Sequence, residues 1–360
     1  MQVELTRASL IHQLKTVFKL DMNQFLFAYT ELRNTQDPVV PSTLPSGKRS
    51  DVRLKIESYL AMIIAALRSC PDDPHDAFTS ESRLGRNVVL KPVGLLPKFA
   101  GAAEANAVTL PVTILDRIMR RATSTTVSRK ALLTLVWQAV VRYKYLGLWT
   151  TMSAATPPHI YSKLLVYDAV EGFASLFNSV TPRYYGLFPD IEHHFGCVGN
   201  FFAVERTSGL LLCNPPYISF IMNAFAVKVE TLLESNPVTV VCILPAFETS
   251  DRKALNDSGR CDSAYPVDYE TDVDTSLLKN SPFSMWCGLY CKNTFAFVES
   301  TTGKSANLTS VLLVILSSQE RMSPTVSEIV VHFPKPDVQC SKGKRAMALY
   351  LDPILLTAPN

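Results

Sequence analysis

The sequence predicts an α/β protein in which a Rossmann-like sheet follows a mainly helical first part. Apolar residues recur with helical spacing among charged residues over 3–32 and again over 52–67. From residue 160 onward the pattern changes to short apolar runs of strand length. Two of these runs, 210–213 and 238–244, flank an amphipathic stretch, and strand, helix, strand is the order of a parallel crossover unit.

In the first part, residues 112–148 are predicted to form a pair of helices that breaks near 122–126, where threonines cluster. Trp137 and Trp149 lie in this apolar helical setting, so we assign both to the core. The segment 71–110 is punctuated by proline and glycine and is predicted to be irregular.

The second part is predicted to consist of short strands joined by helices and loops. A polar insertion over 248–279, acidic on balance, interrupts them, and a loop this long in a compact domain is usually functional or disordered. Its position after the strand that follows the amphipathic helix favours a substrate-side lid. The predicted strands are 166–173, 201–204, 210–213, 238–244, 294–298 and 311–316.

The composition narrows the class of protein. With 360 residues, 47% of them hydrophobic, the chain can bury a large core in one extended domain or two fused ones. The net charge of +3 favours no class of partner. The longest apolar stretches, 59–67 and 131–141, are too short to span a bilayer. Because Glu4 comes early, we expect neither a secretion signal nor a membrane partner.

Cysteines and basic residues give two weaker indications. The eight cysteines are scattered without a Cys-x-x-Cys pair, which favours structural thiols in a reducing compartment and no metal site. Two basic clusters are each a solvated face or, in a nucleic-acid enzyme, a set of phosphate contacts. They are Arg117, Arg120, Arg121, Arg129 and Lys130, and Lys342, Lys344 and Arg345.

The most informative motif is Asn214-Pro215-Pro216-Tyr217. The prolines fix φ and supply no backbone donor, and Pro216 restricts Pro215 to extended conformations. The turn thus holds the Asn214 carboxamide and the Pro215 carbonyl at the carboxyl edge of the sheet, where open α/β sheets bind ligands. Two acceptors aimed at one point suit the two N–H groups of a planar amine. Tyr217 offers a face on which the attached ring can stack.

This turn admits several interpretations. It holds an exocyclic adenine amine or a glutamine side-chain amide for methyl transfer, or it is only a proline-stiffened loop or a ligand for a proline-recognising domain. The strand before it and the helix predicted over 218–235 favour a catalytic turn. The sequence contains no P-loop and no G-x-S-x-G, so other common catalytic motifs do not compete with it.

The stretch EGFASLFNSVTPRYYGLFPDIEHHFGCVGNFFAVERTSGLLLCNPPY, residues 171–217, resembles the catalytic core of the eukaryotic cap-specific adenosine N6-methyltransferases, the phosphorylated-CTD-interacting-factor family. The matching features are an acid followed by Phe-Ala-Ser, then Phe-Pro-Asp at 188–190, then the Asn-Pro-Pro-aromatic turn, all at the family's spacing. The likeness extends over 166–298, and the helical first half shows no matching motif. With this resemblance we expect a helical substrate- or RNA-binding region over 1–155, a Rossmann-like class I methyltransferase domain over 156–335, and a C-terminal extension over 336–360.

The resemblance also implies an activity. Members of this family methylate N6 of the 2′-O-methyladenosine that follows the 7-methylguanosine cap, with S-adenosylmethionine as the methyl donor. Asp190 is a candidate for the ribose hydroxyls by analogy with dinucleotide folds, or lies beside the methionine portion, or caps a helix or turn. The implied residues are Asn214, Pro215, Pro216 and Tyr217 for catalysis; Glu171, Phe173, Ala174, Ser175, Asn178 and Asp190 for the cofactor; and Tyr217, Phe247, Phe195 and Trp286 for the substrate.

The resemblance has departures that bear on partners. The usual glycine-rich cofactor pattern is missing, and Ala246-Phe247 stands where the family tends to have an acid and a tryptophan. The three tryptophans are wrongly spaced for the family's proline-binding module, so we do not expect tethering to the polymerase tail in cis. The expected partner is capped RNA, its cap and first adenosine, in the nucleus, with the cytoplasm as the alternative.

Several rival functions stay open at this stage. Within the enzymes these are a glutamine-N5 protein methyltransferase and a DNA or ribosomal-RNA adenine methyltransferase, both of which normally show a clearer glycine-rich motif. A rival of another class is a catalytically inactive RNA-binding or scaffolding subunit, against which the intact Asn-Pro-Pro-Tyr turn argues.

Overall fold

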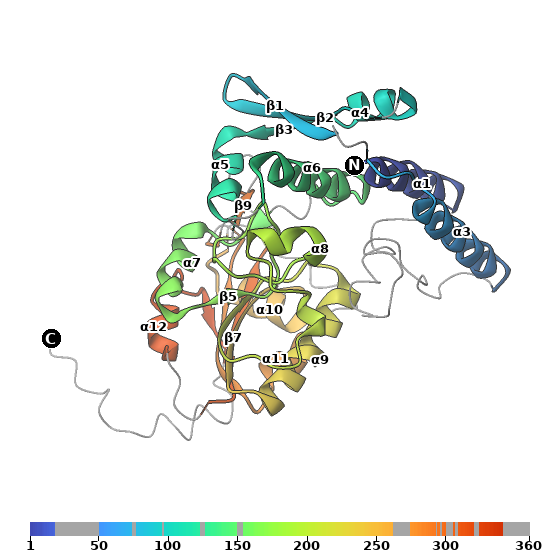
Figure 1. The fold of residues 1–360 in the computed structure, drawn as a ribbon. Coiled ribbons are helices and arrows are strands. Elements are labelled where there is room, and N and C mark those ends of the chain that lie inside the picture. Colours follow the sequence, from blue (N-terminus) through green and yellow to red (C-terminus); the bar gives the residue numbers. More distant parts are fainter. Residues whose placement is uncertain are drawn as a thin grey trace, which may run out of the picture. The chain divides into compact units, whose positions relative to one another are not determined.

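The chain divides into two compact units in the computed structural model (Figure 1). The first unit contains 1–154 and 174–203, and the second contains 155–173 and the described residues from 204 onward. The functional regions expected from the sequence, with bounds at 155 and 335, stay a prediction. The structure describes residues 1–18, 50–73, 77–95, 97–122, 127–149, 154–261, 274–292, 294–295, 297–299, 305–306, 309–319 and 324–340.

The first unit contains helices over the predicted 52–67 and over the described part of 3–32, of which 19–32 lies outside the described residues, and the predicted pair over 112–148 is confirmed. Ser128 begins the second of the pair by accepting a hydrogen bond from the Ala131 amide at 3.2 Å. Trp137 is fully buried in that helix and donates its indole N–H to the Asn106 carbonyl at 2.9 Å, which confirms its place in the core. The helices are α1 (Gln2–Phe18), α3 (Ser50–Arg68), α4 (Ala100–Ala105), α5 (Val112–Arg120) and α6 (Arg129–Tyr145), with a 3-10 turn η1 (Pro97–Phe99).

The prediction that residues 71–110 are irregular was wrong. They form most of an antiparallel sheet of β1 (Phe78–Leu84), β2 (Asn87–Val93) and β3 (Val108–Pro111), in that order. A two-residue turn containing Gly85, at φ +60°, pairs the ends of β1 and β2. One face packs against α6, as Figure 1 shows, and buries alternate side chains: Val88, Leu90, Val108 and Leu110.

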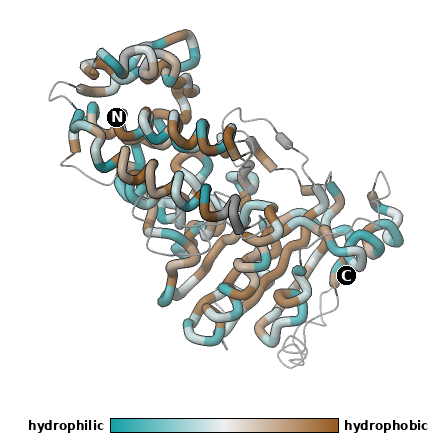
Figure 2. The backbone as a smooth tube through the Cα atoms, turned by 90° about the vertical axis from the view of Figure 1, so that its right-hand side faces the viewer, coloured by the Kyte–Doolittle hydropathy of each residue, from teal (hydrophilic) through white to brown (hydrophobic). Residues whose placement is uncertain are grey.

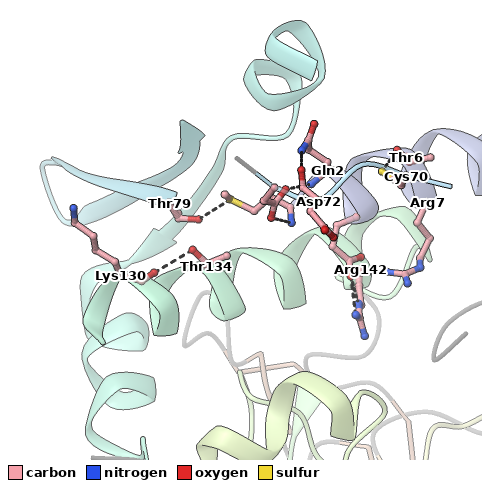
Figure 3. Close-up of polar contacts among 12 residues, drawn as sticks. Gln2, Thr6, Arg7, Cys70, Asp72, Thr79, Lys130, Thr134 and Arg142 are labelled. Atoms are coloured by element: carbon pink, nitrogen blue, oxygen red, sulfur yellow. Dashed lines mark hydrogen bonds and ion pairs between the residues drawn. The ribbon is translucent and has the colours of Figure 1, made fainter. Parts of the chain in front are cut away.

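Polar contacts fix α1 within the first unit, and Figure 3 shows them in close-up. Gln2 donates its side-chain amide to the Asp72 carbonyl at 2.8 Å. Glu4, almost fully buried, accepts from Arg142 of α6 at 2.7 Å and from Arg7. Although burial opposes ionisation, these two guanidinium groups hold the pKa of Glu4 below its ordinary value. The carboxylate therefore couples α1 to α6 as a buried ion pair.

The second unit is built on a six-stranded mixed sheet, so the α/β fold class is confirmed. Its strand order is β12-β8-β11-β7-β6-β5. The strands β5, β6 and β7 run parallel, and β11 runs antiparallel between β7 and β8. Every residue of β7 and β11 is buried, which explains why their sequences are apolar apart from Thr239 and Ser317. The strands are β5 (Val170–Glu171), β6 (Gly209–Cys213), β7 (Val238–Pro245), β8 (Ser284–Tyr290), β11 (Val311–Ser317) and β12 (Val338–Gln339).

Helices cover this sheet on both sides. In Figure 1, α9 lies to the right of the sheet, and α7 and α12 lie to its left. The strands of the sheet are mostly brown in Figure 2, as expected for strands covered on both faces. The helices are α7 (Pro158–Leu164), α9 (Ser219–Ser235), α10 (Thr249–Asp257), α11 (Ser276–Lys279) and α12 (Val326–Val330), and smaller elements are β4 (Ala154–Ala155), η2 (Leu165–Tyr167), and the antiparallel pair β9 (Phe297–Glu299) and β10 (Ser305–Ala306).

Some predicted strands are wrong in type or length. Residues 201–204, predicted as a strand, contain the 3-10 turn η4 (Phe201–Ala203), and within 166–173 only Val170–Glu171 is a strand. The insertion 248–279 contains α10 and α11, while 262–273 lies outside the described residues. The lid expected there stays a prediction.

The cysteines also differ from the expectation of free thiols. Cys261 pairs with Cys291, and Cys287 of β8 pairs with Cys340, which ties two distant segments to one strand. The free thiols are Cys70, Cys197, Cys213 and Cys242. The spacing of the cysteines does not signal these pairs, because the bonded partners lie 30 and 53 residues apart. Among the described helices, none is both long and apolar enough to cross a membrane.

Candidate active site

The Asn-Pro-Pro-Tyr turn follows the carboxyl end of β6, as the sequence predicted. In the strand register, Cys213, the last residue of β6, lies opposite Cys242 of β7. On the other side of β6, Leu212 lies opposite Glu171 of β5. The amide of Ile218 donates to the Pro216 carbonyl at 2.7 Å, and α9 begins at Ser219. The turn therefore lies at the edge where the three parallel strands end, which is the ligand-binding edge of such sheets.

The side chain of Asn214 presents an unused acceptor at this edge. Its Oδ1 is buried and has no hydrogen-bond partner. The hydroxyl of Tyr217 is likewise buried and unpaired. Unpaired buried polar atoms are rare and costly in folded proteins, and a ligand that supplies the missing donor removes the cost. Burial also raises the pKa of Tyr217, so its hydroxyl stays neutral.

Aromatic side chains surround the turn. The Tyr217 ring lies edge-on to Phe247, with centroids 6.4 Å apart, and edge-on to Phe297, with centroids 6.0 Å apart. The guanidinium of Arg252 lies 5.7 Å from the centre of the Phe247 ring. The structure thus brings together two predicted substrate residues, Tyr217 and Phe247. It adds Phe297, which the alternating phenylalanines at 295 and 297 could have signalled.

A second polar group lies at the carboxyl end of β5. Glu171 is buried there, and the following amide, that of Gly172, donates to the Leu212 carbonyl at 2.8 Å. The hydroxyl of Tyr161, on α7, is buried beside Thr156 without a hydrogen bond of ordinary geometry. Burial and, next, the Glu171 carboxylate raise the pKa of Tyr161 well above its ordinary value. Sequence reasoning missed Tyr161, because an isolated tyrosine in a short helix carries no motif.

The predicted cofactor residue Phe173 packs within the second unit. Its ring lies edge-on to Phe225 of α9, with centroids 5.5 Å apart. This contact joins the end of the predicted cofactor strand to the helix that follows the Asn-Pro-Pro-Tyr turn.

The next predicted cofactor residues form a closed loop in the first unit. The Oδ1 of Asn178 accepts from the Ser175 amide at 2.6 Å and from the Ser175 hydroxyl at 2.9 Å. The hydroxyl in turn accepts from the Phe177 amide at 3.2 Å, and the Ala174 amide donates to the Tyr185 carbonyl at 3.0 Å. The two predicted side chains therefore hold the shape of their own loop.

Two arginines from α5 and the turn after it hold the same segment. Arg117 donates to the Phe177 carbonyl, and Arg121 donates to the Ser179 hydroxyl and, at 3.0 Å, to the Val180 carbonyl. Of the alternatives considered for the basic cluster, a solvated face or phosphate contacts, neither describes these two residues. The two arginines instead hold the segment 177–180 in place.

Glu192 is the residue of this segment that sequence reasoning missed. It ends the short helix α8 (Pro189–Glu192), which is followed by η3 (His193–Phe195), and it is fully buried. Its Oε2 accepts from the Leu176 amide at 2.7 Å and from the Tyr184 hydroxyl at 3.0 Å. Its Oε1 accepts from the Tyr143 hydroxyl at 3.1 Å. Burial raises its pKa to about 7.

Three predicted site residues find other surroundings. The Asp190 carboxylate pairs with Arg142 at 2.7 Å, so the ribose role predicted for it gains no support. Phe195 is fully buried in η3 and offers no surface to a substrate. Trp286 lies in β8 packed over Gly288, 9% exposed, so its predicted substrate contact also stays without support. Within the described ranges, no cluster of three or more His, Cys, Asp or Glu could hold a metal ion.

The fold and the turn define a class: an α/β protein with an unpaired, buried amide acceptor in a proline-rich turn at the carboxyl edge of parallel strands. Comparison with known proteins shows which members of this class the chain resembles. Residues 115–267 match the family described as Phosphorylated CTD interacting factor 1 WW domain. Despite that description, the matched residues run from α5 to α10 and include the parallel strands.

Two curated relatives carry the same indication. The chain is 30% identical over 129 residues to the mRNA (2'-O-methyladenosine-N(6)-)-methyltransferase of Homo sapiens and equally to that of Mus musculus. The match covers 33% of this chain and 18% of each relative, so the chain spans under a fifth of their length. The resemblance to the cap-specific adenosine N6-methyltransferases is confirmed for this part of the chain.

Proposed function

We propose that this chain is an S-adenosylmethionine-dependent RNA methyltransferase that acts on adenosine N6, with the cap-adjacent nucleotide of mRNA as its substrate. The observation that carries the proposal is the buried, unpartnered Oδ1 of Asn214 in an intact Asn-Pro-Pro-Tyr turn. The activity named for the human and mouse relatives supports adenosine over the glutamine amide. In this proposal the parallel strands are the Rossmann-like class I methyltransferase sheet, and capped RNA is the partner.

The turn explains how a poor nucleophile becomes reactive. The lone pair of an aromatic amine is delocalised into its ring. If Asn214 Oδ1 and the Pro215 carbonyl accept the two amine hydrogens, the nitrogen moves toward sp³ geometry and its developing positive charge is stabilised. S-adenosylmethionine, when bound, supplies the methyl group. No base is needed beforehand, because the amine proton becomes acidic only after transfer.

The aromatic group around the turn suits the base itself. Tyr217 is half-buried, with its hydroxyl inside and part of its side chain accessible. Phe247 is half-buried beside it. A base stacked on Tyr217 would have its amine held by the preceding residues of the same rigid turn.

The chain also offers groups that fit the cofactor. Glu171 and the unsatisfied hydroxyl of Tyr161 provide an acceptor and a donor at the end of β5, as an ammonium or carboxylate ligand requires. We assign Glu171, Phe173 and the loop 174–178 to S-adenosylmethionine binding. In that loop the backbone, held in place by Ser175 and Asn178, is the part available for contact.

The test uses capped and uncapped RNAs that begin with adenosine, labelled S-adenosylmethionine and mass spectrometry of the first nucleotide. We expect methylation at N6 of the capped RNA by the wild type and by the control Asn223→Ala, and none by Asn214→Ala. S-adenosylmethionine binding should survive in Asn214→Ala. Near-normal turnover by that variant would overturn the proposal, and methylation of a glutamine peptide instead of RNA would favour the protein methyltransferase.

A further inference from the structure

We infer that Glu192 is a positioning residue for cofactor binding: its carboxylate fixes the Leu176 amide and thereby sets the shape of the loop 174–178. The inference rests on the proposed function, because it assigns a role in S-adenosylmethionine binding to that loop. The side-chain hydrogen bonds of Glu192 go to Tyr143, Leu176 and Tyr184, which lie outside the Asn-Pro-Pro-Tyr turn, so its effect is separable from methyl transfer.

Three donors from different parts of the first unit converge on this carboxylate. The Leu176 amide, 16 residues earlier, donates at 2.7 Å. Tyr143 of α6 donates its hydroxyl at 3.1 Å, and Tyr184 donates at 3.0 Å. An ionised carboxylate accepts all three, whereas a protonated one must donate at one position and accept fewer. The Glu192 carboxylate is therefore a buried hydrogen-bond acceptor for these groups.

The Leu176 amide is the inner anchor of the loop. Ser175 and Asn178 close the loop around it, and the Ala174 amide ties its start to the Tyr185 carbonyl at 3.0 Å. The loop thus has an outer hydrogen bond to backbone and an inner one to Glu192. Losing the inner bond leaves a buried amide unsatisfied and frees the residues between the two ends.

The surroundings of Glu192 make its charge sensitive to pH. From α6 it faces Tyr143, and from the segment after the loop it faces Tyr184 and Cys197, whose pKa burial and Glu192 raise to about 12. On its own side the neighbours are Asp190, which pairs with Arg142, and His193 and His194, which follow it in the chain. Burial raises the pKa of Glu192 to about 7, and hydrogen bonds from Tyr184, the Leu176 amide, Tyr143 and the Phe188 backbone act against that rise.

Ionisation therefore strengthens the inner anchor near neutral pH. A hydrogen bond to an ionised acceptor is about twice as strong as one to a neutral acceptor. The loop is held more firmly above pH 7 than below it, and cofactor affinity should rise with pH through this range.

The experiment measures the Kd of S-adenosylmethionine by calorimetry at pH 6, 7 and 8. The proteins are the wild type, Glu192→Gln, and the matched control Glu234→Gln on an exposed part of α9. We expect Glu192→Gln to bind on the order of tenfold more weakly than wild type at pH 8 and about equally at pH 6. Using the ratio of the two proteins cancels the titration of the ligand's own amino group.

A second pair of variants supplies a readout that a merely structural role would not move. Tyr143→Phe and Tyr184→Phe each remove one donor to the ionised carboxylate, so the midpoint of the affinity profile should shift to higher pH. They also carry the test if Glu192→Gln fails to fold. A ratio that stays constant with pH, or a midpoint that does not move, overturns this inference alone. Absence of binding by the wild type overturns the proposed function together with it.

Discussion

Replacing Glu192 by glutamine should change how the stability of the protein depends on pH. Because burial raises the pKa of Glu192 from 4.5 to about 7, the folded state binds a proton more tightly than the unfolded chain does. The resulting stabilisation is fully present below pH 4.5 and is lost as the pH rises through 7. The complete effect is about 3 kcal/mol, of which about 2.5 kcal/mol disappears between pH 5 and pH 8.

Urea denaturation of the wild type and of Glu192→Gln at pH 5, 6, 7 and 8 measures this loss. Other groups also titrate in this range, including Asp251, whose pKa burial raises. Their contributions cancel in the difference between the two proteins, since both contain them. The difference in unfolding free energy should fall by about 2.5 kcal/mol from pH 5 to pH 8. A difference that stays flat over that interval would refute the assignment of a buried, readily protonated carboxyl to this residue.

Three further predictions concern the backbone, the turn and the thiols. Gly196→Ala should destabilise the protein by at least about 2 kcal/mol in a urea titration, because the residue has φ +96° and the new Cβ would lie 2.1 Å from the Pro182 carbonyl oxygen. The control Gly85→Ala, also at positive φ but with open space, should cost about 1 kcal/mol; equal losses would contradict the steric argument. Tyr217→Phe should keep methyl transfer and raise the free energy of unfolding by about 1 kcal/mol, because it removes an unpaired buried hydroxyl. Tyr217→Ala should lower turnover at least about tenfold, because it removes the stacking ring. Equal turnover in both variants would exclude stacking. Alkylation of the unfolded, unreduced protein should label the four free thiols and, after reduction, all eight cysteines, as read by intact mass; eight labels without reduction would exclude both disulfides.

The thiol experiment also bears on where the protein works. Disulfides persist in oxidising compartments and are rare in the nucleus and cytosol. The nuclear location expected from the family resemblance therefore stays a prediction, and the labelling pattern of protein taken directly from its cell would test it.

Local sequence was enough to predict the position of the Asn-Pro-Pro-Tyr turn and the elements beside it. The prolines at 215 and 216 restrict the backbone regardless of context, and the apolar runs before and after α9 have no other means of burial. The antiparallel sheet at 78–111 was not predicted, because its strands are only partly buried and contain exposed polar residues. Only alternate residues of β2 and β3 are buried, and β1 exposes Glu81, Ser82 and Arg83.

The candidate cofactor residues show the same boundary within a single loop. Ser175 and Asn178 are three residues apart, and their mutual hydrogen bonds follow from that spacing. Glu192 meets Leu176, Tyr143 and Tyr184 from 16, 49 and 8 residues away, so no spacing in the sequence signals the contact. Likewise, no spacing signals that Arg117 and Arg121 of the basic cluster hold the backbone carbonyls of Phe177 and Val180.

The sequence by itself determined the α/β class, the crossover β6–α9–β7 and the acceptor turn at its edge, because periodic burial and proline stereochemistry act over a few residues. Only the tertiary structure decided that Asn214 has an unpaired oxygen, that Phe297 joins Tyr217 and Phe247, and that Glu192 is buried among three donors. Burial and hydrogen-bond satisfaction depend on every segment that packs around an atom, and distant segments come together only in the folded chain.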